Sequence, residues 1–325
     1  MDNKIKKIGV LTSGGDAPGM NASIRAIVRT ALKNNIEVIG FMRGYEGLIN
    51  CDYVELHNKS VSEIMQRGGT ILLSARSKEM MTDEGKQKAA DVCKKLNIDA
   101  LIVIGGDGSL TGALHLSKLG INVMGIPGTI DLDLACSDYT IGFDTAVNTA
   151  MDAINKLRDT SSSHERCTII EVMGRNAGYI ALWSGLVNGA EEVLIPEKLD
   201  VTENDIIEVI KENRKIGKIS NVIVLAEGFT GIEAHSFSKK IEEATGIETR
   251  ATILGHLQRG GSPTAVDRMH ASMMGYRAVD QLLKGNVNRI MILKNGNYDD
   301  IDLEEGLKAT RKYDDSLYQI IKTFA

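Results

Sequence analysis

The chain is poor in proline, cysteine and aromatic residues, and it has no excess of positive charge. Its 325 residues include only 4 prolines and 4 cysteines, and aromatic residues make up 4%. The cysteines show no Cys-x-x-Cys spacing, which argues against a metal or redox motif and favours reduced thiols. A formal net charge of −5 does not suggest the clustered Lys and Arg of a nucleic-acid-binding surface. We therefore expect small-molecule partners and no nucleic acid.

Long hydrophobic runs are also missing. No run approaches the roughly 18 apolar residues of a membrane-spanning helix. The N-terminal residues Met1–Lys7 lead into a short apolar strand rather than into the apolar region of a signal peptide. These features predict a cytoplasmic protein with no membrane partner.

Glycine and aliphatic residues are abundant, with 33 glycines and 43% hydrophobic residues. The length exceeds that of one average domain, so we expect two. Short apolar runs alternate with helical patterns such as Phe143–Arg158, which predicts an α/β protein with mainly parallel sheets covered on both faces. The predicted strands are Ile8–Leu11, Val38–Phe41, Ala100–Ile104, Val123–Ile126, Thr168–Val172, Val222–Ala226 and Arg289–Leu293. Ligands bind at the carboxyl ends of strands in such folds.

No long polar linker separates the two halves of the sequence. We therefore expect the domains to share several chain crossings rather than one hinge. The polar stretch 158–166, which contains three consecutive serines, is the one segment whose composition favours a mobile connection.

Two strand-end turns contain the sequence Gly-Gly-Asp. They are Ser13–Asp16 and Gly105–Ser109, and each precedes a predicted helix. Glycines let the backbone approach a polyphosphate, and the helix that follows offers unpaired N–H groups. Either turn alone also fits an ordinary tight turn. The second also resembles a dinucleotide turn, but no acidic ribose ligand follows at the required spacing.

A third strand end carries two carboxylates, Asp131 and Asp133, just after Thr129. Phosphoryl transfer needs an oriented hydroxyl acceptor, a carboxylate that takes its proton, and a divalent ion that spans the phosphates. Asp131 could be the base and Asp133 its electrostatic neighbour, while Asp107 could reach Mg²⁺ through water. A solvated turn remains the alternative for this segment.

Four arginines are expected near strand ends: Arg166, Arg175, Arg250 and Arg259. Guanidinium groups bind phosphate bidentately and stay charged, which suits a substrate that already carries a phosphate. Surface ion pairs are the alternative. His256, in the same stretch as Arg259, is by itself more typical of a structural histidine.

Taken together, these motifs resemble one family, the bacterial ATP-dependent 6-phosphofructokinases. The similarity runs over nearly the whole chain, through the segments 9–21, 139–144 and 255–263. It implies two Rossmann-like three-layer domains and transfer of the ATP γ-phosphoryl group to the 1-hydroxyl of fructose 6-phosphate, with Mg²⁺. The larger, ATP-binding domain would be 1–141 plus 256–305, and the smaller, sugar-phosphate-binding domain 142–255 plus 306–325. The family forms homotetramers whose substrate and effector sites lie between subunits.

The resemblance assigns roles residue by residue. Asp131 matches the family's base, with Thr129, Asp133 and Arg175 as further catalytic residues, and Asp107 matches the Mg²⁺ residue. The implied ATP contacts are Gly15, Arg76, Ser77, Gly106, Asp107, Gly108 and Ser109. The implied substrate contacts are Thr129, Asp131, Arg166, Met173, Gly174, Arg175, Glu227, Arg250, His256 and Arg259, with Arg166 and Arg250 donated by a neighbouring subunit. The implied contacts of ADP or phosphoenolpyruvate as effectors are Arg25, Arg29, Arg158, Gly189, Glu191 and Lys218.

The family also has members that use pyrophosphate, which usually carry an acidic residue after Gly-Gly-Asp and a lysine before the catalytic Thr-Ile-Asp. This chain has Gly108 and Gly128 at those positions. Such small residues leave room for the rest of a nucleotide, so ATP is the expected donor.

The chain departs from the family pattern in several places. Leu132 stands where the family usually has Asn, and residues 135–137 replace a Gly-Thr-Asp turn. We expect Leu132 to desolvate the carboxylates beside it. Leu73 in place of Gly, and Met81 in place of a basic residue, predict weaker ATP binding. Asn58, Ile216 and Ile219 replace basic residues of the effector site, which predicts a diminished allosteric response.

Three functions therefore compete at the level of sequence. The first is an active phosphofructokinase. The second is a catalytically weakened regulatory paralogue that binds sugar phosphate or nucleotide, and the changes at Leu132, Leu73 and 135–137 motivate it. The third is another kinase with a Gly-Gly-Asp-Gly turn, such as an NAD or lipid kinase, for which the segment from Arg250 to Ser262 gives no support.

Overall fold

The computed structural model describes residues 5–325, and the chain divides into two compact units. Unit 1 comprises the residues up to Thr145 together with Arg259–Arg311, and unit 2 comprises Ala146–Gln258 and Lys312–Ala325. The chain thus passes from one unit to the other after Thr145, Gln258 and Arg311. These crossings lie a few residues beyond the predicted boundaries at 141, 255 and 305.

Unit 1 is built on a seven-stranded sheet in the order β11-β10-β5-β4-β1-β2-β3. Its five central strands are parallel, and the edge strands β3 and β11 pair antiparallel with their neighbours. The strands are β1 (Lys7–Ser13), β2 (Glu37–Phe41), β3 (Tyr53–Glu55), β4 (Ala100–Gly105), β5 (Val123–Pro127), β10 (Arg289–Lys294) and β11 (Asn297–Asp302).

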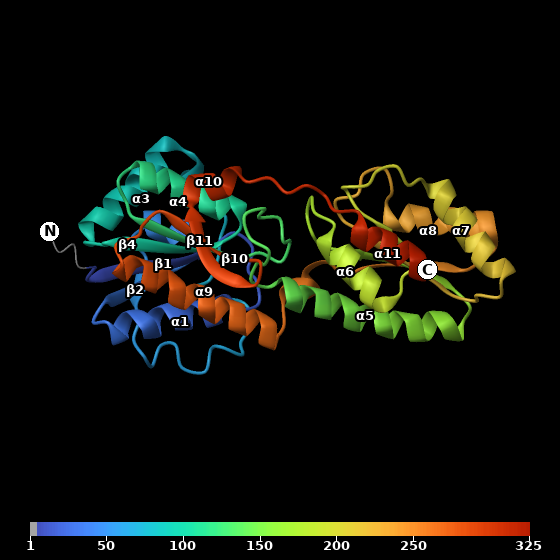
Figure 1. The fold of residues 1–325 in the computed structure, drawn as a ribbon, viewed down its shortest axis with the longest axis horizontal. Helices are drawn as coiled ribbons and strands as arrows, with labels where there is room; N and C mark the ends of the chain where they lie inside the picture. Colours follow the sequence, from blue (N-terminus) through green and yellow to red (C-terminus); the bar gives the residue numbers. More distant parts are fainter. Residues whose placement is uncertain (1–4) are drawn as a thin grey trace. The chain divides into compact units, whose positions relative to one another are not determined.

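Helices cover both faces of this sheet (Figure 1). On one face α1 (Met20–Lys33) packs along α9 (Ala265–Leu283). The other face carries a hydrophobic core that includes residues of the remaining helices of unit 1. These are α2 (Tyr45–Ile49), the 3-10 helix η1 (Glu79–Met81), α3 (Asp83–Lys95), α4 (Asp107–Lys118) and α10 (Leu303–Lys308).

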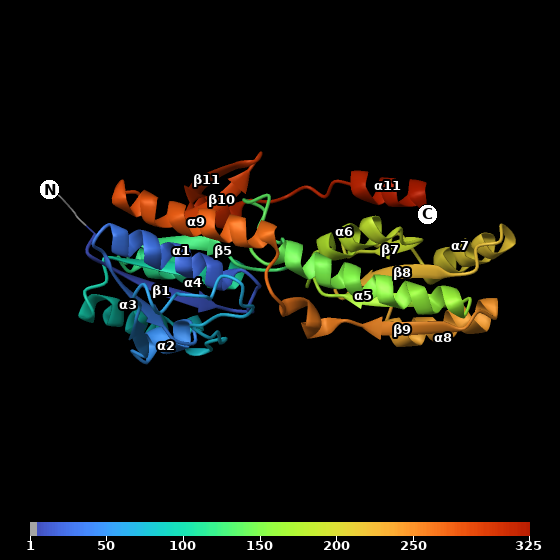
Figure 2. The same cartoon turned by 90° about the horizontal axis from the view of Figure 1, so that it is seen from below.

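Unit 2 is built on a four-stranded, fully parallel sheet in the order β7-β8-β6-β9. Its strands are β6 (Cys167–Val172), β7 (Glu192–Leu194), β8 (Asn221–Ala226) and β9 (Thr249–Ile253). The helices α7 (Glu203–Lys215) and α8 (Ala234–Thr245) share a core on one face. α6 (Tyr179–Asn188) packs on β7 and β8, and α11 (Ser316–Phe324) packs on α6. In Figure 2, β9 is the edge strand nearest α8.

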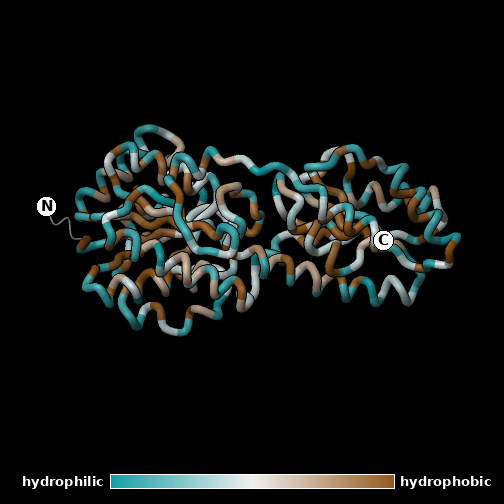
Figure 3. Tube along the Cα trace, viewed as in Figure 1, coloured by the Kyte–Doolittle hydropathy of each residue, from teal (hydrophilic) through white to brown (hydrophobic). Residues whose placement is uncertain are grey.

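The strands of both units concentrate the hydrophobic residues, and the outer loops and helix faces are polar (Figure 3). This is the pattern of sheets buried on both faces, and it confirms the predicted α/β class with mainly parallel sheets. All seven predicted strands are present, at nearly the predicted bounds. The edge strand β11 was not predicted because its sequence, NYDDID, is largely polar. Among residues 5–325 no helix is long and apolar enough to cross a membrane.

The prediction of a mobile connection over 158–166 was wrong. The helix α5 (Phe143–Ser163) continues through the three serines, and the chain then turns directly into β6. Ser161 is buried, its hydroxyl bonds to that of Thr168, and its carbonyl accepts from the Arg166 N–H at 2.9 Å. The Ser162 hydroxyl bonds to that of Ser220 at 3.3 Å, and the Ser163 hydroxyl donates to the Asp159 carbonyl at 2.8 Å, so polar composition alone misleads here.

Candidate active site

The three predicted strand-end loops of unit 1 follow adjacent strands. Ser13 at the end of β1 is the register partner of Gly105 at the end of β4, and Gly105 is in turn the partner of Pro127 at the end of β5. Parallel strands end at the same edge of a sheet, so the two Gly-Gly-Asp turns and the loop that bears Asp131 lie next to one another.

The turn after β1 is held from two sides. The Ser74 hydroxyl donates to the Gly14 carbonyl at 2.6 Å, and Arg259 Nη1 donates to the Asp16 carbonyl at 3.1 Å. A Cβ at Gly15 would lie 2.5 Å from Arg259 Nη1, so a larger residue there would displace the end of this guanidinium side chain. Arg259, assigned to the sugar phosphate by resemblance, therefore lies against the first Gly-Gly-Asp turn.

The turn after β4 leads directly into the first turn of α4, with Gly106 as the N-cap. Asp107 and Gly108 are exposed, and Ser109 is buried. A Cβ at Gly108 would meet nothing within 4 Å, so the space in front of this helix end is open. Backbone N–H groups and the positive end of the helix dipole face that space, and both favour a phosphate group.

The third loop carries Thr129 and Asp131, both buried, and Asp133, which is exposed. The Asp131 N–H donates to the Thr129 hydroxyl at 3.2 Å. A Cβ at Gly106 would lie 3.4 Å from Thr129 Cβ, so the start of this loop adjoins the turn before α4. The loop that bears Asp131 therefore starts beside the N-terminus of α4.

Gly128 does not have the role predicted for it. A Cβ at Gly128 would lie 3.0 Å from Ile104 Cγ2 and from Met20 Cε, so a side chain at this position would point into packed core atoms. The reason for glycine at 128 is this packing, and the position does not provide room for a nucleotide. Only Gly108 fits that part of the prediction.

Arg76 and Ser77 belong to the loop that follows Leu73. Arg76 is exposed, and the Ser77 hydroxyl accepts from the Met80 N–H at 3.3 Å at the start of η1. Leu73 has φ +59°, although it is not glycine, and its carbonyl accepts from the Thr12 hydroxyl at 2.8 Å. The left-handed conformation costs a leucine roughly 1–2 kcal/mol. The family's glycine at this position would avoid that cost.

We predict that Leu73→Asn stabilises the protein by about 1 kcal/mol, because asparagine adopts the left-handed region readily. Leu73 is 48% exposed, so little apolar burial is lost. Urea denaturation measures the change. Leu199→Asn is the control, since Leu199 is similarly exposed at 58% and is not among the described residues with positive φ. An unchanged or lower stability in Leu73→Asn alone would contradict the strain argument.

In unit 2, one group of predicted residues lies at the carboxyl ends of the strands. Glu227, just after β8, accepts with Oε1 from the N–H of Gly174 at 3.2 Å and from that of Arg175 at 2.7 Å. The Met173 N–H donates to Gln258 Oε1 at 2.8 Å. The loop after β6 is thus pinned by two side chains and presents Arg175 at the surface. His256, in the 3-10 helix η2 (Gly255–Arg259) after β9, is exposed.

Arg166 and Arg250 form a second group at the amino ends of β6 and β9, at the other end of the strands of the same sheet. Arg166 Nε lies 2.7 Å from Glu248 Oε2, and Arg250 pairs with the other oxygen of the same carboxylate. The hydrogen bond from Arg166, followed by that from Arg250, lowers the pKa of Glu248. Within one chain these two arginines are therefore separated by the length of the strands from Met173–Arg175 and Glu227.

The predicted effector residues of unit 2 also come together. Arg158 donates to the carbonyls of Asn188 and Gly189, at 2.6 and 2.9 Å. Lys218 Nζ lies 2.9 Å from Glu191 Oε1, and Glu191 is 2% exposed. In unit 1, Arg29 donates to the Asn58 carbonyl at 3.2 Å, and Arg25 is partly buried on α1. Ile216 and Ile219 flank Lys218 and are exposed, at 80% and 48%.

Sequence reasoning missed two residues that organise these groups. Glu248 holds Arg166 and Arg250, and Gln258 is fully buried and holds Met173. Both lie within two residues of a predicted arginine, and that proximity was the available signal. Arg166 is distant in sequence from Glu248, and Met173 lies 85 residues before Gln258, so these two contacts could not be inferred from spacing.

No group of three or more His, Cys, Asp or Glu side chains within residues 5–325 is arranged to hold a metal ion. Asp107 alone, at an exposed helix N-terminus, fits a magnesium ion that keeps most of its ligands as water and substrate phosphate.

Comparison with known proteins gives a consistent result. The family model for phosphofructokinase matches residues 7–282. The chain is 56% identical over 316 residues to an ATP-dependent 6-phosphofructokinase of Clostridium botulinum, which covers 97% of this chain and 98% of that protein. It is 55% identical to the enzyme of the same description from Clostridium novyi, over 98% of this chain and 99% of that one.

Solved structures agree with these matches. The phosphofructokinase of Saccharomyces cerevisiae superposes with a TM-score of 0.88 at 33% identity, over 98% of this chain. This chain spans 47% of that longer one. A pyrophosphate-dependent phosphofructokinase from Marinobacter aquaeolei, at 22% identity and a TM-score of 0.85, shares the fold.

Proposed function

The chain belongs to the phosphofructokinase family, and from that premise we propose that it transfers the γ-phosphoryl group of ATP to the 1-hydroxyl of fructose 6-phosphate. The products are ADP and fructose 1,6-bisphosphate. The observation that carries the proposal is the edge of the unit 1 sheet, where three adjacent strands end in two Gly-Gly-Asp turns and the loop of Asp131.

Unit 1 supplies the nucleotide half of the reaction. The β- and γ-phosphates of ATP would bind at Gly15 and at the N-terminus of α4, which presents Gly106, Gly108 and Ser109. Asp107 would hold Mg²⁺, mostly through water, and the ion would neutralise charge on the phosphates. Arg76 and Ser77 would contact the rest of the nucleotide. Thr129 and Asp133 would assist Asp131, which takes the proton of the acceptor hydroxyl.

Unit 2 supplies the sugar-phosphate contacts. Met173, Gly174, Arg175, Glu227 and His256 come from the carboxyl edge of its sheet. Arg166 and Arg250 lie at the amino ends of the strands. They are therefore a full strand length away from the other residues of this group, and within one chain both groups cannot contact the same small substrate. We infer that they serve the site of a neighbouring subunit in a homotetramer, as the family resemblance implies. Arg259, which touches the Asp16 carbonyl, would contact the substrate from unit 1.

ATP is the proposed donor for two reasons. The Clostridium relatives at 55–56% identity are described as ATP-dependent, and the space in front of Gly108 is open. The same relatives favour an active enzyme over the weakened paralogue considered above, and family membership excludes an NAD or lipid kinase. ADP or phosphoenolpyruvate remains the proposed effector at Arg25, Arg29, Arg158, Gly189, Glu191 and Lys218.

A kinetic panel tests this function directly. Purified protein with Mg²⁺ is assayed against fructose 6-phosphate and other sugar phosphates, with ATP or pyrophosphate as donor. We expect the highest kcat/KM with fructose 6-phosphate and ATP. Turnover with pyrophosphate alone, or saturable binding of ligands with no turnover, would contradict the proposal.

A substitution at position 81 tests the nucleotide pocket. Met81 ends η1 and is 82% exposed, close in sequence to Arg76 and Ser77. Met81→Arg restores the basic residue of the family, and we expect the KM for ATP to fall by roughly 3- to 10-fold, because a charge-assisted hydrogen bond to phosphate is gained. Met81→Gln has comparable length without charge and should leave the KM for ATP unchanged. Equal values for the two variants would refute an ATP contact here.

A further inference from the structure

The loop that carries Asp131 is closed at its base but has a strained turn beside the carboxylate. Gly128 and Ile141 form an isolated parallel bridge, and the Ile141 N–H donates to the Pro127 carbonyl at 2.9 Å, so the loop leaves and returns at the end of β5. Between these points Leu132 has φ +55° and is 5% exposed. A leucine persists in this conformation only where its surroundings hold it.

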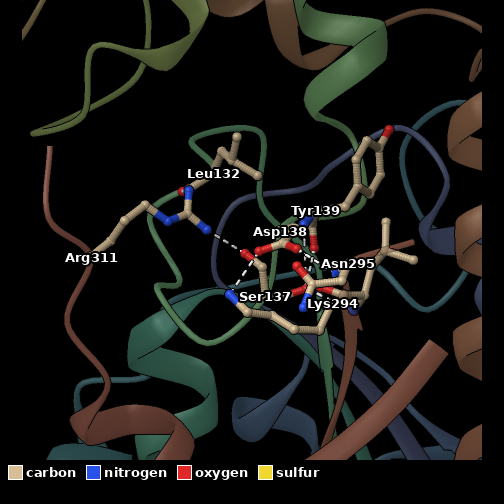
Figure 4. Close-up of polar contacts among 8 residues, drawn as sticks. Leu132, Ser137, Asp138, Tyr139, Lys294, Asn295 and Arg311 are labelled. Carbon is tan, nitrogen blue, oxygen red and sulfur yellow. Dashed lines mark hydrogen bonds and ion pairs between the residues drawn. The ribbon is translucent and has the colours of Figure 1, made fainter. Parts of the chain in front are cut away.

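The far half of the loop is fastened to the turn between β10 and β11. The Ser137 hydroxyl donates to the Tyr139 carbonyl at 2.7 Å and accepts from the Leu293 N–H at 3.0 Å. Asp138 receives Lys294 Nζ and the Asn295 N–H, each at 2.8 Å. Figure 4 shows this group of contacts. Residues 137–138 are therefore fixed to the sheet, while Leu132 lies at the near side of the loop.

Arg311 connects the two sides. It lies between α10 and α11, outside any helix or strand, and is the last residue of unit 1. Its Nη1 donates to the Leu132 carbonyl at 3.5 Å and its Nη2 donates to the Ser137 carbonyl (Figure 4). One planar guanidinium thus holds two carbonyls five residues apart, and the Leu132 carbonyl follows Asp131 directly in the chain.

We propose that Arg311 is a positioning residue for catalysis, which holds the left-handed turn at Leu132 and so keeps the Asp131 carboxylate in its productive orientation. The inference deepens the proposed function and rests on it. A guanidinium suits this task because it stays charged and because its donors have a fixed geometry. Displacement of a catalytic group by about 1 Å can cost roughly 100-fold in rate.

The loop contains a cysteine, Cys136, whose rate of chemical labelling reports whether the loop opens. Cys136 is 5% exposed and lies in the hydrophobic core with Ile290, Ile292 and Leu303. Burial raises the pKa of this thiol, and the charge of Arg311 opposes that shift in part. Loss of Arg311 would by itself make the thiol less reactive, so faster labelling of Cys136 in an Arg311 variant reports opening of the loop. Cys93 and Cys167 are buried elsewhere and report global unfolding.

The experiment compares Arg311→Ala, Arg311→Lys and the control Lys312→Ala in the full chain, because Lys312 is the exposed neighbour. For Arg311→Ala we expect kcat to fall by about 10- to 100-fold with the KM for ATP unchanged. Maleimide labelling of Cys136, followed by peptide mass spectrometry, should accelerate several-fold while Cys93 and Cys167 stay protected. Arg311→Lys should lie between, because lysine keeps the charge but has no second fixed donor.

A double-mutant cycle with Leu132→Asn distinguishes specific coupling between Arg311 and Leu132 from a general loss of stability. Asparagine adopts the left-handed region readily, so Arg311→Ala should cost clearly less in kcat in the Leu132→Asn background. Additive effects, a kcat equal to wild type, or parallel acceleration of all three buried cysteines would each overturn the proposal. If the wild type itself does not turn over fructose 6-phosphate, the proposed function fails. Cys136 labelling then still tests whether Arg311 holds the loop closed.

Discussion

Replacement of Asp131 by asparagine should lower kcat by about 100- to 10,000-fold, which is the usual contribution of a general base. Asp131 is 4% exposed, and its N–H donates to the Thr129 hydroxyl. Asparagine has the same shape and keeps the backbone contact, so the loop should retain its structure. It cannot accept the proton of the substrate hydroxyl. The KM for ATP should change little, because the proposed nucleotide contacts come from other loops.

Steady-state kinetics with saturating fructose 6-phosphate and ATP measure this effect. Asp91→Asn, on the exposed side of α3, removes a carboxylate of the same unit and should leave kcat unchanged. A kcat within threefold of wild type in Asp131→Asn would show that another group takes the proton. A similar loss in Asp91→Asn would show that unit 1 responds to charge in general, and the assignment of the base would then be withdrawn.

Much of the frame of this site follows from local sequence. Apolar runs such as Ala100–Ile104 favour strands buried on both faces, and the alternation with helices favours a parallel sheet. Parallel strands end at the same edge of a sheet, so the sequence places the loops after Ser13, Gly105 and Pro127 on one side of it, while the structure shows that their strands are adjacent.

The parts that could not be predicted depend on contacts between distant residues. Gly128 is glycine because Met20 and Ile104 pack against it, and sequence spacing carries no record of that. Arg311 reaches a carbonyl 174 residues earlier in the chain. The left-handed conformations at Leu73 and Leu132 run against residue preference, and the folded surroundings impose them. Leu73, Leu132 and Arg175 lie in loops of the proposed site, whereas other described residues with positive φ, such as Cys51, Glu63 and Glu165, do not.

The arrangement of unit 2 has a consequence for the assembled enzyme. Arg166 and Arg250 share Glu248 at the amino ends of β6 and β9, whereas Met173, Gly174, Arg175, Glu227 and His256, the other residues of unit 2 proposed to bind the sugar phosphate, lie at the carboxyl ends of the strands. If the two arginines serve a neighbouring subunit, each site combines Asp131 from one chain with Arg250 from another. Arg250→Ala should then raise the KM for fructose 6-phosphate by roughly 10- to 100-fold, because a charge-assisted phosphate contact is lost.

Mixing the two defective proteins should therefore restore activity. Asp131→Asn and Arg250→Ala subunits are unfolded, refolded together in equal amounts, and assayed at fructose 6-phosphate well below the KM of Arg250→Ala. Random assembly gives about one quarter of the sites both native residues, so activity should return to about a quarter of wild type. Asp131→Asn mixed with the double variant offers no native base at any site and should stay inactive. Activity in the first mixture no higher than the average of its two parents would mean that both residues act within one chain.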